Sequence, residues 1–500
     1  MKGMFNFGLL GIRRVFGGVM PPKPSIDKWV KEHMVFWYDM SKPVDTYSQN
    51  FNDWRSYPSV NADIIITSTS FVITRFATLN DTVKCYIPDQ TKNFPGMKVE
   101  VKGIVDGQEL YWGYSANVKL VNITQDGTYD IPPLGTVNGN LSFRNGNIVG
   151  ACNITITQLP SGQSVPTNEI LKANPYLQDF SGNNRPLKLN NFLFAAMSGV
   201  GGYDIASTNI LPDRANVTVT DNRIIHITKK TSTTDNMVNI VPANSNPTHK
   251  FKVTGLSDGR QVSLVNRNGG FYTFDNGEHE VTLTYPEGTT SLYNAIGVTG
   301  DIGDMDVTIE FLPKYPNALI TDGVDDYGVV ENFKSLQNYM MFFQCAITRP
   351  NTTNGMFSTT PIEGNIKGWM LLQGNIANEV RFGNNAYKNF NIMSSIGDKI
   401  SYVLSANNEL MTCYVGEEKA TLAGTYQQTG TNMSLFLSDS NNKARFGSMA
   451  FYKSILFDSV PTKETDGFTE QDLITWVIDN MINGTPQSGV FPYVFPLKVN

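Results

Sequence analysis

The sequence has few of the residues that build metal and redox sites. Its 500 residues include only four cysteines and four histidines. No C-x-x-C motif occurs, and no histidines have the H-E-x-x-H or H-x-H spacing of a zinc site. The cysteines lie far apart in apolar, strand-like runs, which predicts buried thiols at Cys85, Cys152, Cys345 and Cys413. A disulfide framework is not expected, although a single bridge between Cys345 and Cys413 remains open.

Long apolar runs and an excess of positive charge are also missing. No run reaches the ~18 apolar residues of a membrane-spanning helix, so no membrane span is expected. The net charge is -6, which argues against non-specific binding to nucleic acid.

The N-terminal stretch MKGMFNFGLLGIRRVFGGVMPPKP has Arg13 and Arg14 after its apolar residues and no small-residue cleavage site. We therefore do not expect it to be a secretory signal.

Catalytic motifs are scarce as well. The sequence contains no G-x-S-x-G nucleophile motif. The GVGG at residues 199–202 resembles a phosphate-binding loop only superficially, because it lacks the preceding strand, the long helix and the Lys-Ser/Thr pair of such loops. No general acid and base are placed together by the sequence. The protein is therefore not expected to be an enzyme.

Turn residues, in contrast, are plentiful. The 43 glycines, the 25 prolines and many Asn-Gly and Asp-Gly pairs predict short strands joined by tight turns. Hydrophobic residues make up 40% of the chain, which is enough to form real cores. The aromatic residues of LYWGY, Tyr111, Trp112 and Tyr114, could stack on sugars or belong to a sandwich core. We predict a mainly β fold with short helices in the N-terminal region and near the C-terminus.

The N-terminal residues 1–22 are too apolar for a solvated tail. A disordered terminus is one interpretation, and we favour an arm that becomes ordered against a partner surface. After it, SIDKWVKEHM predicts a short helix capped by Ser25. The segment VFWYDMS then predicts a strand.

An internal repeat organises the middle of the chain. Three pairs of segments match at one nearly constant spacing of 152 to 154 residues. Each copy alternates apolar and polar residues and contains an Asp-Gly turn, which predicts two small β-sandwiches. The matching pairs are KVEVKGIVDGQEL at 98–110 with KFKVTGLSDGRQV at 250–262, FVITRFATLNDTVKCYIP at 71–88 with IHITKKTSTTDNMVNIVP at 225–242, and NITITQLP at 153–160 with DVTIEFLP at 306–313.

The C-terminal third is a series of apolar strands followed by one helix, TEQDLITWVIDNMING. Thr469 is expected to cap this helix with Asp472 three residues on, and Gly484 is expected to close it. From NALITDGVDDYGVV to this helix, residues 314–484 resemble laminin-G-like, concanavalin-type jelly rolls. That resemblance is specific for a fold and says little about function.

The motifs FWYDMS, NPYLQDFSGN and YPNAL resemble structural proteins of tailed phages that infect gut bacteria, including the crAss-like group. This resemblance implies a protein of the virion, such as a component of a head or tail fibre or another appendage. It implies docking to other virion proteins through the N-terminal arm, a homo-oligomer such as a trimer, and β-domains that bind host polysaccharide. The alternative is a bacterial surface or secreted lectin, which would have to be exported and would need a signal peptide.

Three acidic residues, Asp322, Asp325 and Asp326, surround Gly323 in DGVDDYGVV. On a strand, Asp325 and Asp326 would point to opposite faces and could not act as a catalytic pair. The resemblance implies that one or more of the three help to hold a calcium ion, which prefers hard oxygen ligands. We favour a local turn, in which the Asp side chains accept hydrogen bonds from nearby backbone donors and Gly323 has a positive φ. No other cofactor is expected.

The predicted organisation has six parts, with the two repeated β-sandwich modules followed by the laminin-G-like jelly roll. The parts are an N-terminal docking arm and short helix (1–60), the first module (61–160), a turn-rich connecting segment (161–212), the second module (213–313), the jelly roll (314–484) and a C-terminal tail (485–500).

Overall fold

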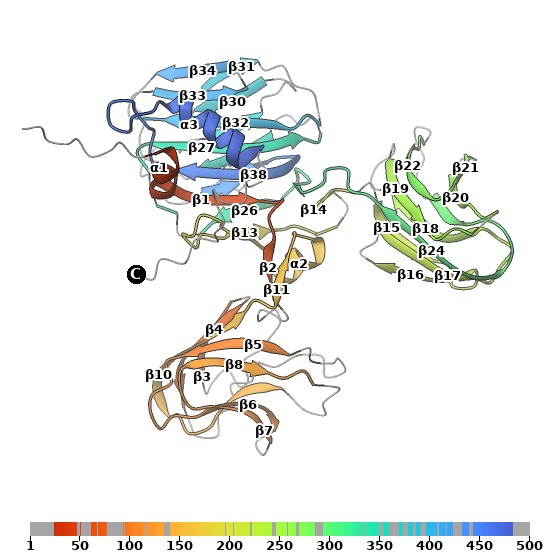
Figure 1. The fold of residues 1–500 in the computed structure, drawn as a ribbon, viewed down its shortest axis with the longest axis horizontal. Coiled ribbons are helices and arrows are strands. Elements are labelled where there is room, and N and C mark those ends of the chain that lie inside the picture. The colour runs from red at the N-terminus through yellow and green to blue at the C-terminus, as the bar shows by residue number, and fades with distance from the viewer. Residues whose placement is uncertain are drawn as a thin grey trace, which may run out of the picture.

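The structure is a computed structural model of the chain. It describes residues 25–47, 51, 62–67, 69–77, 94, 96–115, 118–134, 141–195, 197–203, 205–220, 223–242, 247–257, 259–266, 270–285, 294–331, 333–334, 336–349, 354–359, 370–373, 379–383, 387–391, 397–407, 410–416, 418–423, 433–439 and 444–483. The predicted docking arm at residues 1–22, the tail at 485–500, Cys85 and Gly484 lie outside the described residues. The described part consists mainly of antiparallel strands in three bodies, which confirms the predicted fold class (Figure 1).

The first body, which we call module 1, is a sandwich of two sheets around an aromatic core. The side chains fully buried between the sheets include Phe71, Trp112, Phe143 and Ile156. Of the two alternatives for the LYWGY segment, Trp112 therefore belongs to the sandwich core and is not exposed for stacking on a sugar. The larger sheet has the order β3 (Ala62–Ile66), β4 (Ser70–Phe76), β10 (Gly150–Leu159), β5 (Met97–Lys102) and β8 (Gly127–Ile131). The smaller sheet has the order β7 (Val118–Ile123), β6 (Leu110–Ser115) and β9 (Ser142–Asn145).

The second body, module 2, is built in the same way. Phe251, Val253 and Ile309 are fully buried in its core. One sheet has the order β16 (Ala215–Thr220), β17 (Ile224–Lys230), β24 (Gly303–Phe311), β19 (Thr248–Thr254) and β22 (Gly277–Thr282). The other has the order β15 (Ile205–Ile210), β18 (Asn236–Pro242), β23 (Asn294–Val298), β20 (Val262–Asn266) and β21 (Phe271–Phe274).

The two modules share one strand order, as the repeat predicts. The order β3-β4-β10-β5-β8 of module 1 corresponds to β16-β17-β24-β19-β22 of module 2, and β7-β6-β9 corresponds to β21-β20-β23. In module 2 the partner strands β18 and β15 continue this second sheet.

Gly103 of module 1 and Gly255 of module 2 occupy equivalent positions of the repeat, and the structure explains why both are glycine. Gly103 and Gly255 have φ angles of +91° and +86°. A Cβ atom would lie 1.9 Å from the carbonyl oxygen of Asn153 in module 1 and 1.8 Å from that of Asp306 in module 2. Only glycine therefore fits where each strand leaves its sheet.

The residue after each of these glycines is also held in the same way in both modules. Ile104 N–H donates to Asp126 Oδ1 at 2.7 Å, and Leu256 N–H donates to Asn276 Oδ1 at 3.0 Å. The Asp106-Gly107 turn of module 1 corresponds in the repeat to Asp258-Gly259 of module 2, and Asp258 lies outside the described residues.

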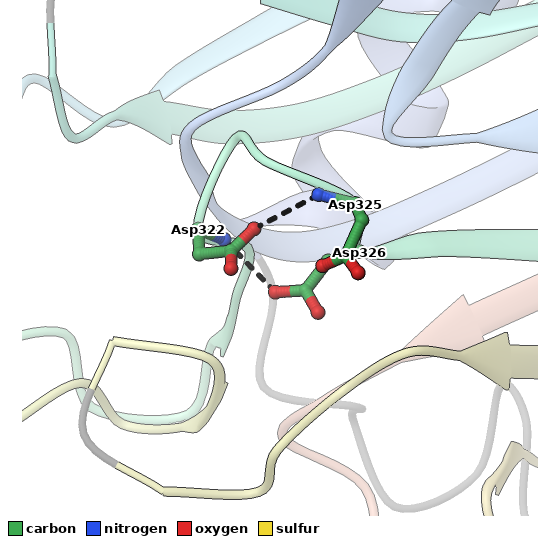
Figure 2. Close-up of side chains that lie close together, drawn as sticks. All are labelled: Asp322, Asp325 and Asp326. Carbon is green, nitrogen blue, oxygen red and sulfur yellow. Dashed lines mark hydrogen bonds between the residues drawn. The ribbon is translucent and has the colours of Figure 1, made fainter. Parts of the chain in front are cut away.

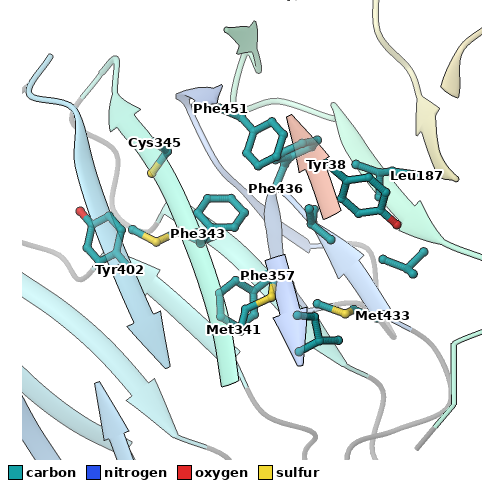
Figure 3. Close-up of a cluster of buried hydrophobic side chains, with 14 of the residues drawn as sticks. Tyr38, Leu187, Met341, Phe343, Cys345, Phe357, Tyr402, Met433, Phe436 and Phe451 are labelled. Carbon is teal, nitrogen blue, oxygen red and sulfur yellow. The ribbon is translucent and has the colours of Figure 1, made fainter. Parts of the chain in front are cut away.

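The third body is a larger sandwich whose two main sheets pack face to face. Figure 3 shows Phe343, Phe357, Phe436 and Phe451 between these sheets, with centroid distances of 5.1 to 5.6 Å for the contacting ring pairs. The first sheet runs β14 (Gly199–Val200), β25 (Leu319–Ile320), β38 (Met449–Phe457), β27 (Tyr339–Ile347), β32 (Ile400–Ala406), β33 (Leu410–Val415) and β34 (Glu418–Ala423), and β1 (Met34–Asp39) also pairs with β38.

The opposing sheet contains strands from both the predicted connecting segment and the predicted jelly roll. It runs β12 (Tyr176–Leu177), β13 (Leu187–Asn190), β26 (Tyr327–Val330), β35 (Met433–Leu435), β28 (Asn354–Thr359), β29 (Met370–Gln373), β30 (Glu379–Gly383) and β31 (Tyr387–Asn391). A small two-stranded sheet of β36 (Leu437–Asp439) and β37 (Ala444–Phe446) accompanies it.

Helices cover the outer face of the first sheet of this sandwich. They are α1 (Ile26–His33) and α3 (Glu470–Val477), and α3 continues as the π-helix η2 (Ile478–Ile482). Their apolar residues pack on outward-facing side chains of the sheet, such as Phe342 and Phe457. Because both of its faces are covered, β27 is buried along its whole length. Among the described residues, no helix is both long enough and apolar enough to cross a bilayer.

The two predicted helix caps are present. The Ser25 side chain accepts from the backbone N–H of Lys28 at the start of α1. At the start of α3, Thr469 and Asp472 form a capping box, in which each side chain accepts from the backbone N–H of the other residue. The remaining short helix, α2 (Asn168–Ala173), is capped by Thr167.

Both modules are inserted into connections of the third sandwich. Module 1 leaves through β2 (Val44–Thr46) and returns through β11 (Gly162–Ser164), and these two strands pair with each other. Module 2 leaves after β14 and returns before β25, where Lys314 N–H donates to the carbonyl oxygen of Gly202 at 3.0 Å. The third sandwich therefore includes strands outside the predicted range 314–484, namely β1, β12, β13 and β14.

The motifs FWYDMS and NPYLQDFSGN meet in the third sandwich through the half-buried carboxylate of Asp179. Its two oxygens accept from the backbone N–H groups of Trp37, Ser181 and Arg185, at 2.9 to 3.0 Å, and from the hydroxyl of Ser181. Burial raises the pKa of Asp179, and these hydrogen bonds oppose the rise. The two motifs thus fix the 179–185 loop to β1.

The prediction of buried thiols is confirmed for Cys345 and Cys413, whereas Cys152 is a free thiol that is only half-buried. Cys345 and Cys413 are buried free thiols, and burial raises the pKa of both. They lie on β27 and β33, with β32 between these strands. Two strand spacings of ~4.8 Å exceed the Cα separation that a disulfide spans. The bridge that the sequence left open is therefore not formed.

Candidate functional site

The acidic turn at residues 322–326 connects the two sheets of the third sandwich, since it follows β25 and precedes β26. Figure 2 shows the side chains of Asp322, Asp325 and Asp326 close together in this turn. One carboxylate oxygen from each residue lies within 4.8 Å of the others. The expectation of opposite faces for Asp325 and Asp326 does not apply, because both residues lie in the turn and β26 begins only at Tyr327.

Asp322 organises the turn itself. Its Oδ1 accepts from the backbone N–H of Val324 at 2.7 Å. It also accepts, more weakly, from the backbone N–H of Asp325 at 3.4 Å (Figure 2). Gly323 has a φ of +76°, and a Cβ atom there would lie 1.9 Å from Ser448 Oγ. These contacts are those of an Asx turn that requires glycine.

Asp326 joins the turn to a neighbouring loop. Its side chain is fully buried. Asp322 N–H donates to Oδ2 at 2.9 Å, and the Ser198 hydroxyl donates to Oδ1 at 3.0 Å. Ser198 Oγ in turn accepts from the backbone N–H of Leu193 at 2.9 Å. Both oxygens of Asp326 therefore already have donors from the protein.

The surroundings of Asp326 favour its neutral form. Burial, together with the negative charges of Asp322 and Asp325, raises its pKa to about 7. The hydrogen bonds from Asp322 N–H and Ser198 act in the opposite direction. Because Asp326 is fully buried, its carboxyl group is not accessible to a substrate.

Calcium binding is chemically compatible with three carboxylates but is not required to explain them. Calcium takes six to eight oxygen ligands, whereas Asp326 is engaged by protein donors on both oxygens and Asp322 on one. Asp325 is exposed, and its backbone oxygen accepts from Asn191. The contacts fit the local turn, and calcium binding by Asp322, Asp325 and Asp326 stays a prediction.

A groove that the sequence analysis did not predict lies on the outer face of the first sheet of the third sandwich. It has a volume of about 620 Å³ and lies between the helices α3 and η2 and the strands β27, β32 and β33. Gln344 and Ser401 from the sheet and Thr475 and Asp479 from the helices line it. The available signal was Gln344, the only amide in the apolar strand YMMFFQCAI.

Comparison with known proteins adds little to these observations. No protein-family model matches the chain, and no curated protein is similar to it in sequence. Several solved structures match about a quarter of it. A Bacillus licheniformis β-glucanase has 13% identity over 27% of this chain and 71% of its own, with a TM-score of 0.22.

Two further matches are of the same quality. The CBM40 domain of a Ruminococcus gnavus sialidase, bound to α2,3-sialyllactose, has 14% identity over 26% of this chain and 80% of its own, with a TM-score of 0.23. A Caenorhabditis elegans galectin has 7% identity over 28% of this chain and 94% of its own, with a TM-score of 0.21. With scores this low, function has to be argued from the residues of this chain.

Proposed function

We propose that this protein is a structural component of a tailed-phage virion, in a head or tail fibre or another appendage, and that it displays β-sandwich modules without catalysing a reaction. It docks to other virion proteins through its N-terminal arm and assembles as a homo-oligomer such as a trimer. Its modules and the third sandwich contact polysaccharide on the host surface. Its location is the virion.

The observation that carries this proposal is the insertion of two copies of one module into a third sandwich. Each copy is anchored at both of its ends, by the β2–β11 pair for module 1 and by the Gly202–Lys314 hydrogen bond for module 2. In Figure 1 the modules extend from the third sandwich in different directions. This arrangement exposes several β surfaces from one base, which suits display and multivalent contact.

The acidic turn supports a non-catalytic role. The glycosidase mechanism uses two carboxyl groups that flank the bond to be broken. Here Asp326 is fully buried and Asp322 holds its own turn. The resemblance of FWYDMS, NPYLQDFSGN and YPNAL to structural proteins of tailed phages supports the virion assignment.

Electron microscopy with antibodies against module 2 tests the proposal. We expect gold label at a defined position on purified phage particles. Label confined to the host cell envelope would contradict the proposal and favour the alternative, an exported bacterial lectin.

A further inference from the structure

We propose that the groove beneath α3 and η2 binds a neutral, hydroxyl-rich ligand, namely a saccharide unit. The inference deepens the proposed function, since a virion appendage that contacts host polysaccharide needs such a site. The groove lies on the outer, helix-covered face of the first sheet, and none of the three acidic residues of the 322–326 turn lines it.

A row of polar side chains crosses the sheet at the groove. Asp39 on β1, Lys453 on β38, Gln344 on β27 and Ser401 on β32 are successive partners across neighbouring strands. Next to this row, the outer face of the sheet carries apolar side chains such as Phe342, and the helices cover them. Polar residues are costly at this depth unless each has a hydrogen-bond partner.

Gln344 is the member of this row that lacks a full set of partners. Its side chain is only 3% exposed and lines the groove. Its Nε2 donates to Ser401 Oγ at 3.1 Å, whereas its Oε1 has no hydrogen-bond partner among the described residues. A buried acceptor of this kind is satisfied by a donor that enters the groove, and a ligand hydroxyl supplies one.

The charges at the groove favour a neutral ligand. Lys399 and Asp479 are the lining residues with opposite formal charges, so they balance each other. Lys453, behind the groove, pairs with Asp39 at 3.2 Å and donates to the carbonyl oxygen of Met481. Among the described residues at the groove, no excess positive charge is therefore left for an anionic group.

The remaining lining suits the apolar faces of a sugar ring. Val403 from the sheet and Ile474 and Ile478 from the helices provide apolar surface, and Ser401 and Thr475 provide hydroxyl groups nearby. The volume of about 620 Å³ lies within the ~300–1,000 Å³ range of small-ligand sites. Apolar walls with a few fixed polar groups are typical of such sites.

The test uses the full chain on a printed array of neutral and acidic oligosaccharides, followed by calorimetric titration of the strongest ligand. We expect binding of neutral sugars. Gln344→Leu should weaken it about tenfold, as expected for the loss of one hydrogen bond in a desolvated site. Thr475→Arg, at an exposed helix position that lines the groove, should abolish it. Thr421→Arg on β34, also exposed, is the matched control and should leave it unchanged.

Folding of the variants is checked by thermal melts. Gln344→Leu removes the unpartnered Oε1 acceptor and also the hydrogen bond from Nε2 to Ser401, so its melting temperature should stay close to that of the wild type. If Gln344→Leu fails to fold, Thr475→Arg alone decides the test. Absence of sugar binding, binding of acidic sugars only, or equal binding by wild type and Thr475→Arg would each overturn the inference. None of these outcomes affects the virion assignment, which depends on the position of the protein in particles.

Discussion

Replacement of Asp326 by Asn tests the interpretation of the acidic turn, because the variant keeps the shape of the side chain and removes its charge. In the folded protein the pKa of Asp326 is raised to about 7 by burial and by the neighbouring carboxylates. In the unfolded chain it is near ~3.9. Below about pH 4 the carboxyl group is protonated in both the folded and the unfolded state, so it does not lower the free energy of unfolding. As the pH rises from about 4, ionisation of the group lowers the free energy of unfolding, and this loss is complete above about pH 7.

The magnitude follows from the size of this shift. Three pKa units at 1.36 kcal/mol each give an upper limit of about 4 kcal/mol for the cost of the ionised, buried carboxylate. The amide has one acceptor where the carboxylate has two, so either Asp322 N–H or Ser198 loses a partner. We therefore expect Asp326→Asn to be about 1–3 kcal/mol more stable than the wild type at pH 8. The difference should shrink as the pH falls to 5.

Calorimetric unfolding of the full chain at pH 5 to 8, with chelator and then with millimolar calcium, measures this difference. The turn interpretation predicts that Asp326→Asn is more stable than the wild type by the same amount in chelator and in calcium. A calcium site predicts that calcium raises the melting temperature of the wild type and that Asp326→Asn loses this gain. Asp325→Asn, at the exposed acid, is the control and should change the stability in chelator much less than Asp326→Asn, because its charge is the smallest contribution to the raised pKa of Asp326. A variant less stable than the wild type at pH 8 in chelator would refute the pKa argument.

The remaining predictions concern the modules, the third sandwich and the arm. Gly103→Ala and Gly255→Ala should each destabilise their module by about 2–4 kcal/mol, because both positive φ and a backbone clash oppose a Cβ atom. Gly107→Ala, with positive φ but open space, should cost only ~1–2 kcal/mol; equal losses for Gly103 and Gly107 in calorimetry would argue against the clash. Asp179→Ala should destabilise the third sandwich by about 2–4 kcal/mol, since it leaves three backbone donors unpaired; hydrogen exchange in β1 measures this, and unchanged exchange would contradict it. Removal of residues 1–22 should leave all three bodies folded and stop incorporation into particles; normal copy number in truncated particles would disprove the docking role.

Much of the β architecture could be predicted from the sequence because it depends on local signals. The repeat is visible because three pairs of segments match at one nearly constant spacing. The structure shows the backbone contacts that require the shared glycine at 103 and 255. The caps at Ser25 and Thr469 follow from short-range hydrogen bonds. The turn at Gly323 is likewise local, which is why its Asx interpretation agrees with the contacts of Asp322.

The insertion of the modules was not predictable in the same way. Strands β12 and β14 have two residues each, so they carry no periodic pattern. The strands β13 and β14 pair with β26 and β25, which lie more than 100 residues away across the inserted module 2. The groove at Gln344 depends on which face of β27 the helix α3 covers. Such long-range packing is decided by the whole fold, and a single amide in an apolar run only hints at it.

Quantitative mass spectrometry of purified phage particles tests the central claim most directly. The proposed function predicts that peptides of this chain, from both modules and from the third sandwich, are present in intact particles at a fixed ratio to the major capsid protein. Their absence from particles that retain a full set of other structural proteins, together with their presence in the host envelope or medium, would contradict the account.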